Sequence, residues 1–203
     1  MDKETENQRY IIGIDEVGRG PIAGPVAVCS FKCEPNFFDS ISINTPLRDS
    51  KKLTKKQREK WFEYLKEEKE KGSCDFAVSM VSAEWIDKVG IVRSIKKALD
   101  SSLKKVVTNP KEVYVYLDGG LKAPLEFINQ ETVIKGDELH PVISCASIIA
   151  KVSRDTLMYE YAKEYPEYGF ENHVGYGTKV HYEAVKKTGL TPLHRKSFLK
   201  NIK

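Results

Sequence analysis

The stretch Ile11-Ile12-Gly13-Ile14-Asp15-Glu16-Val17-Gly18-Arg19-Gly20-Pro21 joins a buried-strand pattern to two adjacent acids. The apolar, partly β-branched residues at its start predict a core strand over residues 10–14. Burying one unpaired carboxylate costs several kcal/mol, and two in sequence at the end of a core strand cost more. The pattern is therefore typical of a site that binds a cation.

The glycines after the two acids affect how the acids are presented. Adjacent strand residues point to opposite faces, so strand geometry directs at most one of Asp15 and Glu16 into a site. The other acid requires a bend in the chain, which Gly18 and Gly20 permit. We therefore expect the strand to end at the acids.

Length and composition indicate one globular domain. The chain has 203 residues, of which 40% are hydrophobic and 31% charged, and this is enough for one well-buried core and short for two. No apolar run approaches the length of a membrane span, and residues 1–9 are polar. We therefore expect no membrane association, no cleaved leader and a cytoplasmic location.

The four cysteines, Cys29, Cys33, Cys74 and Cys145, are widely scattered. They lack the paired spacing of a structural zinc site. Cys29 and Cys145 sit among small apolar residues, which favours buried free thiols. Free thiols fit a reducing cytoplasm.

Basic residues are concentrated in two segments of the chain. The net charge is only +4, from 33 basic and 29 acidic side chains. Residues 48–60 nevertheless contain seven basic and two acidic residues, and residues 174–203 contain seven basic and one acidic. A local acidic site bordered by basic segments suits a metal-dependent enzyme that acts on a polyanion.

Hydrophobic periodicity predicts strands first and alternating strands and helices afterwards. The expected strands cover residues 10–14, 26–31, 75–81, 113–117 and 132–134, and the expected helices cover 54–72, 82–87, 91–106, 144–165 and 178–189. Thr54 and Gln57 have the spacing of a capping box. The order of elements indicates an α/β domain with a mixed central sheet of about five strands flanked by helices.

Three of the expected strands are followed by acids: Asp15 with Glu16, then Asp118, then Asp137. Ligands of open α/β sheets bind where strand ends gather, and oxygen ligands suit hard cations such as Mg²⁺ or Mn²⁺. Each acid alone could equally be a turn or cap residue, and Asp-Gly is a common turn dipeptide. The coincidence of three acid-terminated strands favours a shared site.

The opening stretch resembles the opening motif of the bacterial ribonuclease HII enzymes, which cut RNA within RNA/DNA hybrids. Further motifs of that family occur in the family's order across nearly the whole chain: Asp49-Ser50-Lys51-Lys52-Leu53, Leu117-Asp118-Gly119, Lys135-Gly136-Asp137, Ala146-Ser147-Ile148-Ile149-Ala150-Lys151-Val152, Gly175-Tyr176-Gly177-Thr178 and His194-Arg195-Lys196-Ser197-Phe198. Together these matches are highly specific. They imply the ribonuclease H-like fold in one catalytic domain over residues 1–203, whose last ~30 residues form a basic helical substrate-binding segment.

The resemblance also implies the catalytic residues. Asp15, Glu16, Asp118 and Asp137 match the family's four metal-binding acids. Four acids exceed the needs of one Mg²⁺ or Mn²⁺ and suggest two metal positions about 4 Å apart. One metal would present a water to the phosphorus and the second would stabilise the departing 3′ oxygen, which gives a 3′-hydroxyl and a 5′-phosphate.

The same resemblance implies substrate contacts. Gly18-Arg19-Gly20 matches the family's sensor of the ribose 2′-hydroxyl, the group that distinguishes RNA from DNA. Tyr176 matches the tyrosine that stacks at the nucleotide after the ribonucleotide, and Ser50 and Lys51 match a phosphate-binding segment. The family usually has a lysine where this chain has Val174, which implies one phosphate contact fewer.

Other interpretations of individual residues stay open at this point. Arg19 could form a salt bridge in a strained turn, and the basic helix start after residue 50 could be a solvated face. Lys151 and Arg154 could be phosphate contacts or solvated charges in equal measure. His173, His181 and His194 are expected to be structural, because satisfied histidines outnumber ligands.

The function expected from these observations is cleavage of the RNA strand of RNA/DNA hybrids and cleavage 5′ of single ribonucleotides in duplex DNA, in ribonucleotide excision repair. A monomer is expected. Three alternatives compete with it: the sister ribonuclease HIII, for whose extra N-terminal domain there is no room before Asp15; a DNA-acting nuclease or recombinase of the same superfold; and a catalytically dead nucleic-acid-binding protein. Gly18-Arg19-Gly20 with Tyr176 argues against the second, and the four acids argue against the third.

Overall fold

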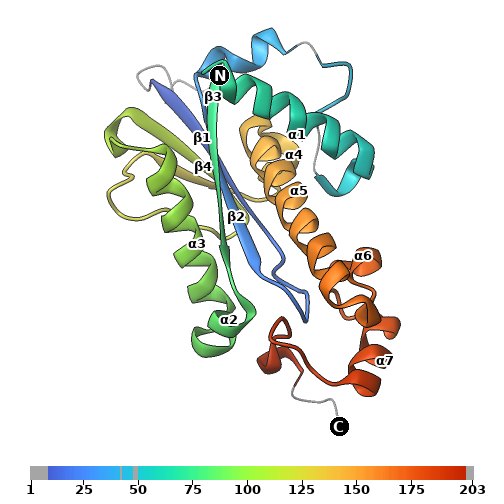
Figure 1. Ribbon diagram of the computed structural model, residues 1–203. Helices are drawn as coiled ribbons and strands as arrows, with labels where there is room; N and C mark the ends of the chain where they lie inside the picture. The colour runs from blue at the N-terminus through green and yellow to red at the C-terminus, as the bar shows by residue number, and fades with distance from the viewer. Residues whose placement is uncertain (1–8, 42, 48–49, 200–203) are drawn as a thin grey trace.

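A five-stranded mixed sheet organises the protein, shown in Figure 1 as a computed structural model that describes residues 9–41, 43–47 and 50–199. The strands are β1 (Tyr10–Val17), β2 (Val26–Cys33), β3 (Cys74–Val81), β4 (Val113–Asp118) and β5 (Gln130–Val133). Their order is β3-β2-β1-β4-β5, with antiparallel pairing from β3 to β1 and parallel pairing from β1 to β5. The expected mixed α/β sheet is confirmed.

Helices cover both faces of this sheet, with α3 and α5 on opposite sides (Figure 1). The α-helices are α1 (Lys55–Glu70), α2 (Ala83–Val89), α3 (Ile91–Val106), α4 (Gly136–Leu139), α5 (Pro141–Glu164), α6 (Phe170–His173) and α7 (Lys179–Thr188). Short 3-10 helices cover Pro35–Ser40, Ser50–Lys52, Pro110–Glu112, Pro166–Tyr168 and Lys196–Phe198. Within the described ranges, no helix combines the length and apolarity needed to cross a membrane.

Strand alternation divides the core into two layers. Ile12 and Ile14 of β1 pack in the layer under α3, whereas Ile11 packs in the layer between the sheet and the helices α1 and α5. This follows from the opposite orientation of successive strand residues. All four cysteines are free and buried, as expected for Cys29 and Cys145.

Local capping signals predicted the starts of α1, α2 and α7 correctly, whereas α5 begins at Pro141 and not at the expected residue 144. Thr54 caps α1 in a full capping box with Gln57, and the side chains of Ser82 and Thr178 cap α2 and α7. Each cap satisfies main-chain N–H groups that have no partner in the first helical turn.

The strand ends differ from the expectation at both acidic segments. Strand β1 does not end at Ile14: it continues through Asp15 and Glu16 to Val17, because β2 pairs with it along this whole length. The bend comes later, at Gly18, whose φ of 89° lies in the left-handed region that favours glycine. Strand β5 ends at Val133, so Asp137 belongs to the short helix α4 rather than to a strand end.

Helix α5 lies directly against β1 at Gly13. A Cβ atom at Gly13 would lie 2.1 Å from the carbonyl oxygen of Val142 in α5. Such a contact is far inside van der Waals distance and involves main-chain atoms on both sides, so it cannot be relieved by a side-chain rotation. Glycine at this position therefore sets how closely helix and strand approach.

We predict that Gly13→Ala lowers the free energy of unfolding by roughly 3 kcal/mol or more, because α5 must move away from the sheet. Urea or thermal unfolding measures this loss. Gly120→Ala is the matched control, since a Cβ there meets no heavy atom within 4 Å. Equal stability of the two variants would contradict the close contact.

Candidate active site

Asp15 lies buried in β1 beneath helix α5. Its Oδ1 accepts a hydrogen bond from the main-chain N–H of Glu16 at 2.7 Å. Ser147 of α5 also hydrogen-bonds the Asp15 carboxyl group. The Ser147 hydroxyl is in turn 2.8 Å from that of Ser50, so a chain of hydroxyls leads from Ser50 to the acid.

The acids of this region disfavour one another's ionisation. Burial raises the pKa of Asp15 to about 8, the charges of Glu16 and Asp118 act in the same direction, and the Ser147 hydrogen bond opposes them. Burial also raises the pKa of Glu16, the Asp118 charge adds to this, and the Arg19 charge opposes it. Three of the four expected acids, Asp15, Glu16 and Asp118, therefore lie within electrostatic reach of one another.

Asp118 connects this group to the fourth acid. It ends β4, and its Oδ1 accepts a hydrogen bond from the N–H of Gly136 at 2.7 Å. Asp137 follows Gly136 directly and is buried. Its Oδ2 is 3.8 Å from Nζ of Lys51, and its carbonyl accepts a hydrogen bond from the hydroxyl of Ser144.

A close approach permits the contact between Asp118 and Gly136. A Cβ at Gly136 would lie 2.5 Å from Cδ1 of Ile143 and 3.4 Å from Oδ1 of Asp118. Lys135, just before it, is in the left-handed region with φ of 57°. The turn that brings Asp137 into helix α4 thus depends on an unusual conformation that strand periodicity cannot reveal.

The donor set fits a hard divalent cation by its chemistry. Carboxylate oxygens are the preferred ligands of Mg²⁺ and Mn²⁺. A bound cation would favour the ionised form of Asp15, whose pKa is raised first by burial and then by the charges of Glu16 and Asp118. Among the residues that the structure describes, no three acidic, histidine or cysteine side chains are arranged as they stand to hold a metal ion. The carboxylates bond protein donors instead, as Asp118 does with Gly136.

The Gly18-Arg19-Gly20 segment continues directly from these acids. Arg19 is exposed, and its Nη1 is 3.4 Å from Oε1 of Glu16, so the salt-bridge interpretation of Arg19 is confirmed. A Cβ at Gly20 would lie 3.8 Å from Cε1 of Tyr176. Tyr176 is 44% exposed, and the structure therefore places the two expected ribose-sensing elements next to each other.

Two lysines of the basic segment before α1, Lys51 and Lys52, contact acidic side chains. Lys51 lies near Asp137, and Nζ of Lys52 is 2.6 Å from Oε2 of Glu138. Ser50 is buried, so it reaches the acidic group through Ser147 instead of facing solvent. Asp49, which belongs to the same motif, lies outside the described residues.

Arg154 is neither a phosphate contact nor a solvated charge, and both expectations were wrong. It is fully buried and donates hydrogen bonds to the main-chain carbonyls of Pro25, Val174 and Ala23. Lys151 pairs with Asp155 at 2.9 Å. Sequence reasoning also gave no role to Ser147 and Arg195, although both lie within motifs of the family.

The three expected structural histidines form a buried group beside the Tyr176 loop. His194 Nδ1 accepts the N–H of Thr191, so its proton is on Nε2, 3.1 Å from Nε2 of His181. His181 then accepts there and donates from Nδ1 to the carbonyl of Tyr176. His173 stacks on His181 at 4.5 Å. Their structural role is confirmed.

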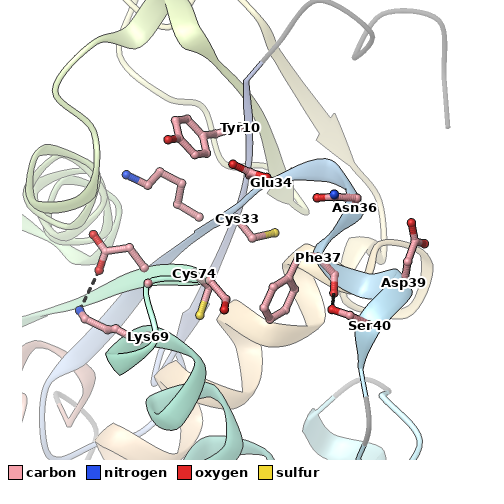
Figure 2. A pocket seen from close by; sticks show the side chains of 13 residues that line it. Tyr10, Cys33, Glu34, Asn36, Phe37, Asp39, Ser40, Lys69 and Cys74 are labelled. Carbon is pink, nitrogen blue, oxygen red and sulfur yellow. Dashed lines mark hydrogen bonds and ion pairs between the residues drawn. The ribbon is translucent and has the colours of Figure 1, made fainter.

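A hollow of about 750 Å³ lies at the other end of the sheet, where β1 begins (Figure 2). Cys33, Cys74 and Phe37 line it, with an ion pair between Lys69 and Asp75. It contains none of the candidate catalytic residues. The chemistry of the acidic group therefore does not depend on this hollow.

Comparison with known proteins gives a consistent result. A family model described as Ribonuclease HII matches residues 12–201. The chain is 43% identical over 195 residues to Ribonuclease HII of Clostridioides difficile (strain 630), covering 95% of this chain and 71% of that protein.

The fold of this chain is similar to those of solved ribonuclease structures. The ribonuclease H2 of Pyrococcus horikoshii OT3 matches with a TM-score of 0.70 and 25% identity, covering 95% of this chain and 96% of that one. Bst-RNase HIII in complex with Mn²⁺ matches with a TM-score of 0.71 and 17% identity, covering 98% of this chain and 72% of that one.

We predict that Asp15→Asn raises the melting temperature in the presence of EDTA at pH 7. Because the folded pKa of Asp15 is raised to about 8, the buried acid opposes folding at pH values above its unfolded pKa, and asparagine does not. Millimolar Mn²⁺ should raise the melting temperature of the wild type by several degrees and that of the variant much less. Asp39→Asn is the control, and an unchanged wild-type melting temperature with Mn²⁺ would contradict a metal site.

We also predict an acid-dependent loss of stability through His181. Burial lowers the pKa of His181 to about 4. The neutral ring therefore contributes its full stabilisation of the fold above about pH 6.5, and this stabilisation is lost as the pH falls toward about 4. Asp15 titrates in the same range with the opposite sign, so the quantity to measure is the difference in unfolding free energy between wild type and His181→Gln. This difference should shrink with falling pH, and a difference that stays constant from neutral pH to about pH 4 would contradict the prediction.

Proposed function

Because this chain belongs to the ribonuclease HII family, we propose that it hydrolyses the RNA strand of RNA/DNA hybrids and cuts 5′ of single ribonucleotides in duplex DNA. One observation carries the proposal: the mutually coupled acids Asp15, Glu16 and Asp118 adjoin the Gly18-Arg19-Gly20 segment. An acidic group that attracts cations is thereby placed beside main-chain groups that can contact a ribose.

In this proposal Asp15, Glu16, Asp118 and Asp137 hold two divalent ions, Mn²⁺ or Mg²⁺. Bound divalent ions lower the pKa of a water nucleophile and stabilise the departing 3′ oxygen. The protein contributes position: Ser147 holds the Asp15 carboxyl group, and the Gly136 amide holds that of Asp118. Asp15 is buried, which limits its contact with bulk solvent.

Recognition of the substrate falls to the neighbouring segments. The backbone of Gly18, Arg19 and Gly20 contacts the 2′-hydroxyl, and the exposed ring of Tyr176 stacks on the next nucleotide. Ser50 and Lys51 belong to the segment that binds substrate phosphate, and they adjoin the acids through Ser147 and Asp137. The exposed lysines of α7, Lys179, Lys186 and Lys187, contact the phosphate backbone.

In this proposal the active form of the enzyme is a monomer in the cytoplasm. All four acids and both ribose-reading segments belong to one chain, which supports activity as a monomer. The four buried free cysteines support a reducing compartment.

We expect cleavage of a DNA duplex that carries one ribonucleotide when Mn²⁺ or Mg²⁺ is present, and none of an all-DNA duplex. Product analysis should show a 3′-hydroxyl and a 5′-phosphate. Asp118→Asn keeps the size of the side chain but lacks its charge, so it should bind this duplex and cut it at least about 100-fold more slowly. Cleavage by this variant at the wild-type rate would refute the assignment of the acids, and binding of the hybrid without cleavage by the wild type would indicate a binding protein.

A further inference from the structure

Arg195 is a buried cation that holds the segment after β1. Its side chain is fully buried. Its Nη2 donates to the carbonyl of Gly18 at 2.7 Å, its Nη1 to that of Arg19 at 3.1 Å, and its Nε to that of Gly24 at 2.9 Å. One guanidinium group therefore fixes both ends of the loop that contains Gly18-Arg19-Gly20.

Arg154 of α5 makes a second set of contacts of the same kind. It too is fully buried. Its Nε donates to the carbonyl of Pro25 at 2.8 Å, its Nη2 to that of Ala23 at 3.2 Å, and its Nη1 to that of Val174 at 2.9 Å. This side chain joins the loop after β1 to the segment that leads into Tyr176.

Main-chain hydrogen bonds complete the connection between these segments. The N–H groups of Ile22 and Ala23 donate to the carbonyl of Gly175, at 2.9 and 3.2 Å. The N–H of Gly24 donates to the carbonyl of Leu193, and the N–H of Arg195 to that of Ile22. Three segments distant in sequence thus form one hydrogen-bonded unit.

Two buried arginines are a costly way to hold a loop. Burial lowers the pKa of Arg195 to about 9, and the charge of Arg154 acts in the same direction. In the described ranges neither forms an ion pair, and each satisfies its donors on carbonyls alone. The planar, rigid fork of donors explains the use of arginine, since no neutral side chain reaches three carbonyls at once.

Both guanidinium groups also lie within electrostatic reach of the Tyr176 phenol. The ring of Tyr176 lies beside Gly20. The residues that the arginines fix are therefore the two elements to which the proposed function gives the reading of the ribose. Neither arginine faces solvent, so neither can contact a phosphate.

We propose that Arg154 and Arg195 are positioning residues for ribose discrimination, which lock the Gly18-Arg19-Gly20 loop and the Tyr176 loop into one rigid reading unit. The inference rests on the proposed function, because it concerns how that site tells a ribonucleotide from a deoxyribonucleotide. It assigns these arginines neither chemistry nor direct contact with the substrate. Their loss should weaken discrimination more than overall affinity for a duplex.

The test measures binding in the Asp118→Asn background, which separates recognition from cleavage. Fluorescence anisotropy gives Kd for two duplexes of the same sequence, one with a single ribonucleotide and one entirely of DNA. Arg195→Lys and Arg154→Lys keep the charge but lose the planar fork of donors. In each variant, the Kd for the all-DNA duplex divided by the Kd for the ribonucleotide duplex should fall about tenfold. Lys32→Met is the control, because Lys32 also ties two elements by donating to a carbonyl, that of Val106, away from this unit.

The outcomes separate this inference from the proposed function. If Asp118→Asn alone binds both duplexes equally, the ribose-reading function fails. If it discriminates and the lysine variants discriminate equally well, or lose affinity for both duplexes in parallel, only the positioning role is overturned.

Hydrogen exchange of the wild-type protein tests the same unit without any variant that has to fold. The amides of Ile22, Ala23, Gly24 and Arg195 should show protection that agrees within about tenfold and should open together. Exchange of the loop amides far faster than that of Arg195 would show that the segments open independently, and this would overturn the proposal.

Discussion

The close approach of α5 to β1 at Gly13 is the constraint on which the rest of the structure depends. Because a Cβ atom at Gly13 would lie 2.1 Å from the carbonyl oxygen of Val142, only glycine lets the helix lie this close to the strand, and any side chain there would push the helix away. One consequence is that Ser147 lies beside Asp15, and another is that Arg154, two turns further on, reaches the carbonyl of Pro25. A single helix therefore sets both the acidic group and the loop that follows it.

The acidic group shows how a fold can keep an arrangement that opposes its own stability. Asp15 is buried and repelled by Glu16 and Asp118, and its raised pKa expresses that conflict. Hydrogen bonds from Ser147 and the Glu16 amide offset part of it. Perturbed pKa values cluster at functional sites. The family to which the chain belongs and the carboxylate donor set agree with a functional role for this destabilising arrangement.

Local patterns predicted most of the architecture, and long-range contacts explain what they missed. The capping box at Thr54 and the stripe of α3 are signals within one turn or one helix, and the structure follows them. The extension of β1 through Glu16 depends on pairing with β2, which no single strand reveals. Asp137 lies in α4 instead of at a strand end because Lys135 adopts a left-handed conformation. Arg154 was expected to be a phosphate contact or a solvated charge, because its carbonyl partner at Pro25 lies 129 residues away in the sequence.

Val174 belongs to a segment that the protein holds through its main chain. It is a β-branched residue with φ of 43°, a conformation that such residues rarely adopt. Arg154 donates a hydrogen bond to the carbonyl of Val174, and the Val174 side chain packs against the apolar cluster around Met158 and Phe170. Every amino acid supplies the same carbonyl, so the arginine contact puts no selective pressure on the identity of this side chain. The hydrogen bond that holds this segment would therefore persist with a different side chain at residue 174.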